Sequence, residues 1–346
     1  MTQAAAKTGM GPTVAAAVEQ HFPEEQRIIE DNLAYSILPF SMRAFVHLTR
    51  PVFIRDWMIR SSEKSAPGIW GGLMCRKRYI DQKLIESIDQ IDAVLDLGAG
   101  FDTRAYRLPA LADMPVWEVD QPENIGPKQA RLRKLLGEVP THVKLVPIDF
   151  DREELEAVLA RYGYSAEMRT FFILEAVTQY LTEAGIRSTF EFLGGAAPGS
   201  RLAFTYVLKG FIDGQVMYGQ ENLYKQYIVR DKIWLFGMDP EGVANLLGSY
   251  GWRVVEHLGY EELAERCIVS NQAAINQSSW SLSLAGCCFY SVRARPRPRH
   301  AGLLKQSGLT CKQRGFTSSK TEASLISRSG ITFRAGIRLC ISPRQA

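Results

Sequence analysis

The chain has 346 residues, of which 46% are hydrophobic and 23% are charged, enough for one large α/β domain or two smaller domains. Twelve of its 41 basic residues but only one of its 37 acidic residues lie beyond Ser291. The first 290 residues therefore carry a formal charge of about −7, and the overall charge of +4 does not indicate nucleic-acid binding. The sequence shows no membrane-spanning run, no secretory signal and no paired cysteines of a zinc site, so we expect a cytoplasmic protein with reduced thiols and no metal.

The first 80 residues are expected to form a helical cap. Apolar residues at three- and four-residue spacing, and breaks at Pro67-Gly68 and Gly71-Gly72, predict helices over Glu24–Leu38, Val52–Arg60 and Tyr79–Ile91. The core is expected over residues 81–295. A basic, disordered tail is expected over residues 296–346, because it is rich in Ser, Arg and Gly and its apolar residues have no sustained period.

From Ala93 onward, short apolar segments alternate with amphipathic ones. Strands are predicted at Ala93–Leu97, Pro115–Val119, Val143–Ile148, Thr170–Leu174, Arg201–Val207 and Trp252–Leu258. Helices are predicted at Lys128–Leu136, Glu153–Tyr162, Glu183–Leu193 and Pro240–Tyr250. This alternation predicts a doubly wound, mostly parallel sheet with right-handed crossovers, which is a Rossmann-like α/β fold. A last strand could come only from Ala285–Arg293, and without it one edge of the sheet would stay open.

A glycine-rich turn follows the first predicted strand. Gly98-Ala99-Gly100 permits a ligand to approach the backbone closely at the carboxyl end of that strand. The dinucleotide fingerprint needs a third small residue at position 103, where Thr103 stands, so a nicotinamide-dependent oxidoreductase is disfavoured. A P-loop is excluded because no Gly-Lys-Ser/Thr follows.

Acidic residues end the next three strands. Asp120 could accept both hydroxyls of a ribose, and Asp149 could accept from an adenine amino group while the backbone N–H of Phe150 meets the ring. Glu175 could face the ammonium or the ribose side of a ligand. The carboxyl ends of parallel strands share one crevice, so these carboxylates suit a cationic nucleoside without phosphate, which is S-adenosylmethionine.

Each acidic residue also has a structural explanation. Asp120 or Glu118 could cap the turn before Pro122, and capping at Asp151 could explain part of the cluster around Asp149. Glu175 lies in an apolar run, where a buried carboxylate needs a partner.

Four segments together resemble a known family. They are, in chain order, VLDLGAGFDTRAYRL, WEVDQPENIGPKQARL, IDFDREEL and FFILEAVTQYL. They are similar to the leucine carboxyl methyltransferase-like family, and more closely to its bacterial-type branch of S-adenosyl-L-methionine-dependent methyltransferases. The resemblance runs from about Thr13 to Arg266. It implies a class I methyltransferase fold and S-adenosyl-L-methionine as the cofactor.

The resemblance also implies a cofactor site. By this resemblance, Arg76 holds the methionine carboxylate, and Gly98 and its loop pass beside the methionine. Asp120 binds the ribose, and Asp149 with Phe150 contacts the adenine. Glu175 contacts the ligand near the fourth strand. Phe150 replaces a more usual Leu, and Lys77 stands where a small polar residue is more usual. From the residues alone, Arg76 to Arg78 could equally be a solvated basic run, and either arginine could pair with a carboxylate.

The resemblance implies O-methylation, in one branch of a protein's C-terminal carboxylate and in the other of small molecules. The bacterial-type motifs favour a carboxylate or hydroxyl on a small molecule, with neither nucleic acid nor membrane as a partner. A non-catalytic S-adenosylmethionine-binding protein is the remaining alternative.

No catalytic residue is assigned. A hydroxyl acceptor would need a base, but His47, His142 and His257 are better explained as structural or exposed residues. Tyr180 could face the acceptor or pack on the following helix. The aromatic residues of Gly210–Trp234 could line an acceptor pocket or form a core beneath a lid; they are Phe211, Tyr218, Tyr224, Tyr227 and Trp234.

Overall fold

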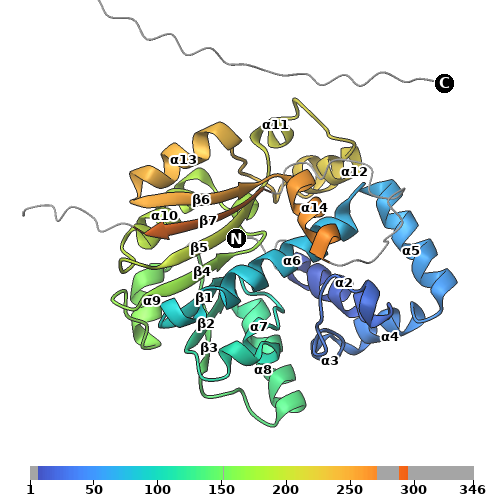
Figure 1. Ribbon diagram of the computed structural model, residues 1–346, viewed down its shortest axis with the longest axis horizontal. Coiled ribbons are helices and arrows are strands. Elements are labelled where there is room, and N and C mark those ends of the chain that lie inside the picture. The colour runs from blue at the N-terminus through green and yellow to red at the C-terminus, as the bar shows by residue number, and fades with distance from the viewer. Residues whose placement is uncertain (1–6, 151, 271–287, 295–346) are drawn as a thin grey trace, which may run out of the picture. The chain divides into compact units, whose positions relative to one another are not determined.

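The computed structural model describes residues 7–150, 152–270 and 288–294, and its centre is a seven-stranded sheet (Figure 1). The strand order is β3-β2-β1-β4-β5-β7-β6. Neighbouring strands from β1 to β5 pair in parallel, and β7 pairs antiparallel with both β5 and β6. The strands are β1 (Ala93–Leu97), β2 (Val116–Asp120), β3 (Val143–Pro147), β4 (Thr170–Leu174), β5 (Arg201–Tyr206), β6 (Trp252–Leu258) and β7 (Cys288–Ala294).

The predicted Rossmann-like fold is confirmed, and the six main strands begin and end within one residue of their predicted bounds. Every residue of β1 and of β4 is buried, as expected of central strands covered on both faces. The edge strand β6 instead alternates in burial. The last strand, β7, overlaps the predicted segment Ala285–Arg293 and ends one residue later, while residues 285–287 lie outside the described residues.

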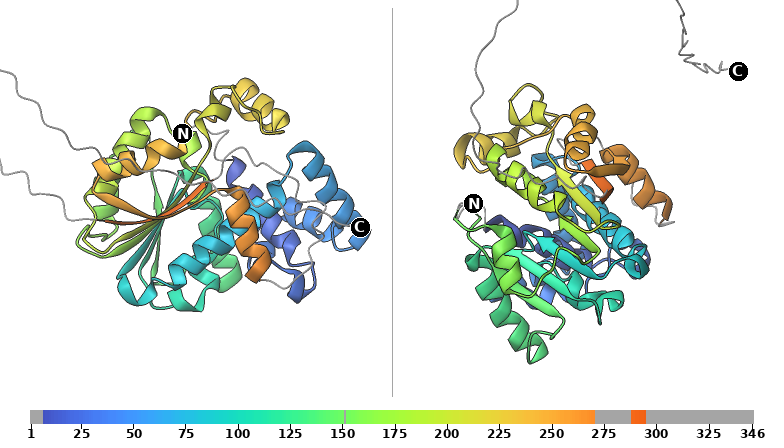
Figure 2. Two further views of the ribbon diagram at one scale, coloured as in Figure 1. Left: turned by 45° about the horizontal axis from the view of Figure 1, so that its top comes forward. Right: turned by 90° about the vertical axis from the view of Figure 1, so that its left-hand side faces the viewer.

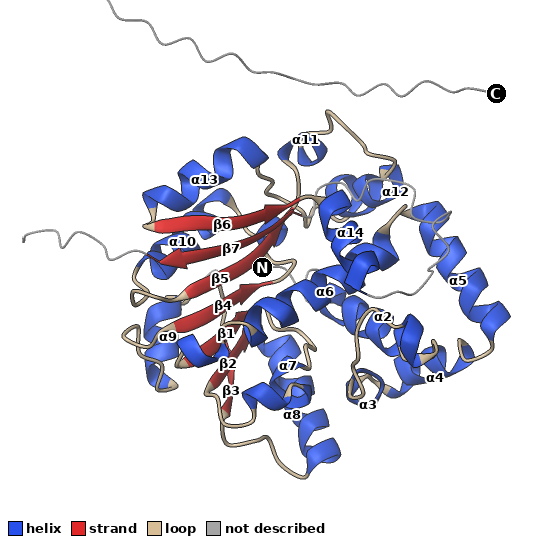
Figure 3. Cartoon of the chain, viewed as in Figure 1, coloured by secondary structure: helices blue, strands red, loops and turns tan. Residues whose placement is uncertain are grey.

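Helices cover both faces of the sheet (Figures 2 and 3). Successive strand residues point to opposite faces, so Leu95 joins one hydrophobic core and Val94 the other. One face carries α9 (Leu155–Arg161), α10 (Glu183–Gly194) and α13 (Pro240–Ser249). The other carries α6 (Ile69–Ile85), α7 (Arg104–Arg107), α8 (Pro122–Leu136) and α14 (Tyr260–Ser270).

The N-terminal region is helical but differs from its prediction. Its elements are η1 (Lys7–Met10), α2 (Gly11–Glu19), η2 (Glu24–Gln26), α3 (Ala34–Ile37), α4 (Phe40–Leu48) and α5 (Val52–Ser65), followed by α6. The predicted helix Glu24–Leu38 is wrong. Arg27 is extended, the backbone N–H of Ile28 donates to the Glu19 carboxylate at 2.7 Å, and that of Ala34 donates to Asp31 at 2.9 Å. Side chains therefore satisfy part of this backbone, and the helical spacing of its apolar residues spans two short helices, η2 and α3, with a loop between them.

The predicted break at Gly71-Gly72 is also wrong, because α6 begins at Ile69 and runs through both glycines. Gly68, with φ of +75°, supplies the turn before it. The predicted helix Tyr79–Ile91 is the second half of α6, which ends at Ile85 and is followed by η3 (Ile88–Gln90). The predicted boundary at residue 80 therefore falls inside a helix, and the predicted tail lies outside the described residues. None of the described helices is long and apolar enough to span a bilayer.

Candidate functional site

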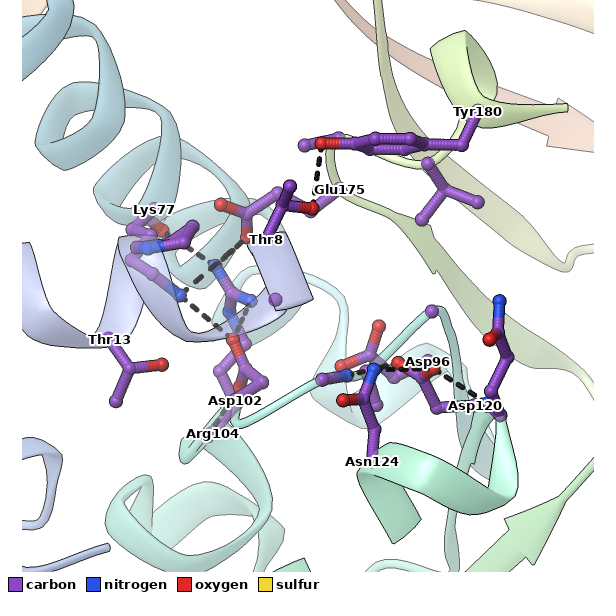
Figure 4. A pocket seen from close by; sticks show the side chains of 18 of the residues that line it. Thr8, Thr13, Lys77, Asp96, Asp102, Arg104, Asp120, Asn124, Glu175 and Tyr180 are labelled. Carbon is purple, nitrogen blue, oxygen red and sulfur yellow. Dashed lines mark hydrogen bonds and ion pairs between the residues drawn. The ribbon is translucent and has the colours of Figure 1, made fainter. Parts of the chain in front are cut away.

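A cavity of about 110 Å³ lies at the carboxyl ends of β1, β2 and β4 (Figure 4). Its walls come from the loops after these strands, from α6, and from the start of the chain at η1 and α2. Four of the six predicted cofactor-binding residues line it: Arg76, Gly98, Asp120 and Glu175. Segments that lie up to 172 residues apart in the chain thus meet at the edge of the sheet where open α/β folds bind ligands.

Asp149 and Phe150 do not line this cavity. Both follow β3, one strand beyond β2. The Asp149 carboxylate lies 3.5 Å from the guanidinium of Arg152 at the surface, and Phe150 packs against the hydrophobic core. Their contact with adenine stays a prediction.

The glycine turn after β1 has no room for side chains. Gly98 has φ of +78°, and a Cβ there would lie 2.4 Å from Cγ2 of Val177. Gly100 has φ of +45°, and a Cβ there would lie 3.2 Å from the carbonyl oxygen of Gly9. The turn is therefore a bare-backbone cradle between the loop after β4 and the N-terminal segment.

Asp120 ties the cradle to the next strand. Its carboxylate accepts hydrogen bonds from the backbone N–H of Gly100 at 2.6 Å, from that of Gln121 at 2.6 Å, and from Nδ2 of Asn124 at 2.9 Å. Burial raises the pKa of Asp120, and these hydrogen bonds oppose that rise. Asp120 thus bonds the turn before Pro122, as the structural alternative predicted. The same carboxylate also lines the cavity. Its neighbour Glu118 is structural, because it pairs with Lys128 at 2.7 Å.

Buried cations surround Glu175 on the opposite wall. Nε of Arg76 lies 2.8 Å and Nη2 of Arg104 lies 2.7 Å from its two carboxylate oxygens. Asp102 accepts from Nζ of Lys77 at 3.0 Å and from Nη1 of Arg104 at 2.5 Å. Arg76 and Lys77 are each only 4% exposed, so the solvated-run alternative is wrong for both. Glu175 therefore has cationic partners for its buried charge, with a hydrogen bond at Oε1 and ion pairs alone at Oε2 among the described residues.

These contacts determine the ionisation of the carboxyl groups of Glu175 and Asp102. Burial pushes the pKa of Glu175 upward, but Lys77, Arg104 and Arg76 outweigh it and lower that pKa to about 2. The pKa of Asp102 is lowered in the same way, by Arg104 and Lys77 against its burial. Nε of Arg104 also pairs with Asp81 at 2.5 Å, so the three cations Arg76, Lys77 and Arg104 meet three carboxylates here. Among the described residues Arg76 makes one ion pair, through Nε, which leaves its two Nη groups for a ligand carboxylate.

Sequence reasoning missed four charged residues of this site: Lys77, Asp96, Asp102 and Arg104. Three of them lie inside the motif VLDLGAGFDTRAYRL. A usable signal was present at Asp96, a carboxylate in the middle of an apolar strand. Its burial, together with nearby Asp102, raises its pKa well above the ordinary value.

The N-terminal segment crosses the cavity. Oγ1 of Thr8 donates to the hydroxyl of Tyr180 at 2.9 Å, and Oγ1 of Thr13 donates to the carbonyl of Phe101 at 3.1 Å. Figure 4 shows Tyr180 above Thr8 and Glu175, which overlap in this view, with Asp120 on the other side of the site. Pockets for small ligands usually measure about 300–1,000 Å³. The cavity of about 110 Å³ beside this segment is therefore small for such a ligand.

The aromatic residues after β5 form a small core next to the site. Phe211 is fully buried and contacts Trp234, on which Tyr227 stacks with ring centroids 4.8 Å apart. Trp234 meets the ring of Tyr180 edge-on at 6.5 Å. None of the five predicted aromatic residues lines the cavity, so the core-beneath-a-lid alternative describes them. Tyr180 is the contact between this core and the cavity.

None of the three candidate histidines lines the cavity either. His142 lies 3.3 Å from the carbonyl of Ala105, His257 lies 3.3 Å from the hydroxyl of Tyr206, and His47 is exposed on α4. The strained backbone at the site is at Ala176, next to Glu175, with φ of +57°. Its N–H donates to Oγ1 of Thr205 at 2.8 Å, which fixes the turn that presents Glu175.

The chain is similar to known methyltransferases over the region that builds this cavity. The family model described as leucine carboxyl methyltransferase matches residues 9–194, more than half of the chain. A protein of Mycolicibacterium gilvum (strain PYR-GCK), named “Putative S-adenosyl-L-methionine-dependent methyltransferase”, is 34% identical over 155 residues, or 44% of this chain and 50% of the relative. A protein of the same name from Mycobacterium sp. (strain KMS) is 30% identical over 210 residues, or 57% of this chain and 66% of the relative.

The chain thus spans about half the length of the first curated relatives that it matches. Among solved structures, the “putative methyltransferase” from Thermobifida fusca YX superimposes with a TM-score of 0.51, covering 82% of this chain and 94% of that one. Its identity is 16%, so this likeness concerns the fold alone.

Proposed function

Because the chain belongs to the leucine carboxyl methyltransferase family, we propose that it is an S-adenosyl-L-methionine-dependent methyltransferase acting on an oxygen of a small molecule. The observation that carries the proposal is the pairing of two unlike walls in one cavity. Buried cations lie on the side of α6 and β4, and the glycine cradle with Asp120 lies on the side of β1 and β2.

The residues present fit the proposed cofactor. The two Nη groups of Arg76 suit the carboxylate of a methionine moiety, and the bare backbone at Gly98 lets such a moiety pass close to β1. Asp120, held by Gly100 and Asn124, suits ribose hydroxyls. When bound, the sulfonium supplies an already activated methyl group, so the chain's own task is to orient the acceptor and exclude water.

Tyr180 lies where the acceptor is proposed to bind. Its hydroxyl lies at the cavity and is held by Thr8, so it is placed to orient an acceptor oxygen by hydrogen bonding. A carboxylate acceptor needs no base. This fits a cavity whose histidine candidates lie elsewhere among the described residues.

Calorimetric titration of the full chain tests the cofactor. We expect S-adenosylmethionine to bind at one site and NAD to give no heat beyond dilution. Asp120→Ala removes the carboxylate at the ribose position and is expected to weaken cofactor binding by at least about tenfold, which corresponds to roughly 1.4 kcal/mol. Glu183→Ala, on the exposed face of α10, is the matched control. No binding of S-adenosylmethionine would overturn the proposal.

Methyl incorporation from labelled cofactor tests the acceptor. The screen compares small carboxylic acids, phenols and a peptide with a free C-terminal leucine. Labelling of the small acids or phenols supports the proposal. Labelling of the peptide alone would assign a protein carboxylate instead, and cofactor binding without any transfer would indicate a binding protein.

A further inference from the structure

Helices α4 and α5 expose a set of large apolar side chains that are not packed in the interior of the cap. Among the described residues, α4 buries Val46 alone and α5 buries Arg55 alone. Phe40 is 78% exposed, Phe53 74% and Trp57 70%. We call the following exposed residues the α4–α5 face: Phe40, Phe45, Leu48, Val52, Phe53 and Trp57. Scattered exposed apolar residues are ordinary, but six of them on two consecutive helices are not.

The exposed residues follow the helical repeat. On α5, Phe53 and Trp57 are followed by Arg60 and Lys64 at positions i, i+4, i+7 and i+11, so aromatic residues and cations share one stripe. On α4, residues Phe40 and Leu48 line a shallow apolar hollow. A short turn over residues 49–51 joins the two helices. Figures 1 and 2 show both helices on the side of the cap away from the sheet.

The charge around this face is opposite to that of the rest of the body. Residues 40–65 hold five basic residues against two acidic ones, whereas the first 290 residues together carry about −7. Arg55 is buried, where its Nη1 donates to the carbonyl of His21 at 2.6 Å. The other four cations are Arg43, Arg50, Arg60 and Lys64, and of these all but the half-buried Arg43 are exposed.

A second copy of the chain is a poor occupant of this face. A twofold contact would bring two cationic surfaces together, with Asp56 and Glu63 as the only acidic residues of the two helices. An anionic bilayer surface matches both properties. Phe and Trp side chains settle at the boundary between headgroups and acyl chains, and arginines beside them pair with lipid phosphates.

We propose that the α4–α5 face is a peripheral docking site for an anionic lipid surface. Phe53, Trp57 and Leu48 enter the interface, while Arg50, Arg60 and Lys64 contact the headgroups. The protein then works at a bilayer surface without crossing it, which departs from the sequence expectation of no membrane partner.

Vesicle flotation of the full chain tests the proposal. One arm uses phosphatidylcholine alone, and the other adds phosphatidylglycerol. We expect at least about tenfold stronger partition into the anionic vesicles, falling steeply as added salt screens the charges. Phe53→Ser with Trp57→Ser is expected to abolish flotation. Each of Arg50→Gln and Arg60→Gln is expected to lower anionic partition by about fivefold.

Two residues of the exposed strand β6 supply matched controls. Val255→Ser removes an apolar side chain that is 59% exposed, and Arg253→Gln removes an exposed cation. Neither is expected to change flotation, because β6 is not part of the α4–α5 face, although Glu256 of this strand bonds Tyr79 of α6. Unfolding midpoints equal to wild type show that every variant is folded.

Wild-type protein that fails to float on anionic vesicles would overturn the proposal. So would partition that is unchanged in the Phe53 and Trp57 variant. A third contrary outcome is a wild-type dimer, seen by sedimentation, that the same variant dissociates, because it would make this face an interface between copies.

Discussion

At the scale of single residues, Glu175 is held ionised by three buried cations rather than by water. Its carboxylate contacts Arg76 and Arg104 directly, and Lys77 lies 4.0 Å away. Removing one partner of such a group leaves buried charge without compensation. The same carboxylate therefore has two tasks, stabilising this wall and fixing the position of Arg76.

Glu175→Gln is expected to lower the free energy of unfolding at neutral pH, because it removes this charge and keeps the shape. The folded-state pKa of about 2 lies below the ordinary 4.5, so the stabilisation is present above pH 4.5 and is lost as the pH falls toward 2. The shift corresponds to about 3 kcal/mol. Urea unfolding of both proteins across this pH range measures it.

The deficit of the variant is expected to shrink steadily as the pH falls below 4.5. Glu183→Gln, which breaks the exposed pair with Arg187 on α10, is the control and should change stability by less than about 1 kcal/mol. A deficit of equal size at both ends of the range would contradict the assigned role of Glu175.

Gly98→Ala is expected to destabilise the fold for two separable reasons. The added Cβ would lie 2.4 Å from Cγ2 of Val177, and φ of +78° strains any side-chain-bearing residue. Gly163 has the same φ with open space around it, so Gly163→Ala measures the backbone part alone, about 1–2 kcal/mol. Unfolding free energies of the two variants give the contact part by difference.

Adding Val177→Ala to Gly98→Ala removes the clashing methyl. The double variant is expected to recover the contact part and to match Gly163→Ala once the cost of Val177→Ala itself is subtracted. If the two single changes are additive, Val177 does not set the requirement for glycine at position 98.

The charged wall shows how far sequence reasoning reaches at this scale. Glu175, Asp120 and Gly98 could be predicted because each directly follows a strand that its apolar run makes evident. Lys77 and Arg104 could not be predicted as site residues. A basic residue on a helix has the same local sequence pattern whether its side chain faces water or pairs with a buried carboxylate. Only the folded chain, which places Lys77 of α6 and Arg104 of α7 beside the residue that follows β4, brings these cations to Glu175.

At the scale of elements, η1 and the start of α2 act as a cover over the cavity. The cover is fastened by the hydrogen bond from Thr8 to Tyr180 and rests on Gly100 through Gly9. A nucleoside-sized ligand needs more room than a cavity of about 110 Å³ gives, so we expect this cover to move when the ligand binds.

Thr8→Val is expected to speed the release of S-adenosylmethionine by about fivefold, since one neutral hydrogen bond contributes roughly 1 kcal/mol. Thr8→Ser keeps the hydroxyl and is expected to release the ligand at the wild-type rate. Stopped-flow displacement by excess S-adenosylhomocysteine measures both rates. Equal rates in all three proteins would show that this bond does not fasten the cover.

Elements differed in how well they could be predicted. The strands are short apolar runs between turns. Because the central strands are buried on both faces, their sequences are continuously apolar and show no helical spacing. Residues 24–38 carried an equally regular pattern, yet Glu19 and Asp31 take over the backbone hydrogen bonds that a helix would have made. These partners lie before or inside the segment and do not change its apolar spacing, so periodicity alone could not reveal them.

At the scale of the whole sheet, seven strands place the cavity at the carboxyl ends of the parallel set. The order of strands β1 to β5 follows from parallel pairing with helical crossovers, which the sequence predicts. The place of β7 does not. Its pairing with both β5 and β6 depends on partners more than thirty residues away from it in the chain.

The insertion of β7 between β5 and β6 has a consequence for synthesis on the ribosome. Every residue of the cavity emerges by position 180, but the strand that joins β6 to the sheet ends at Ala294. Until then a nascent chain carries an unpaired edge at β5 and a detached β6, both open to pairing with other chains. The residues of the cavity are therefore translated first and the sheet is completed last.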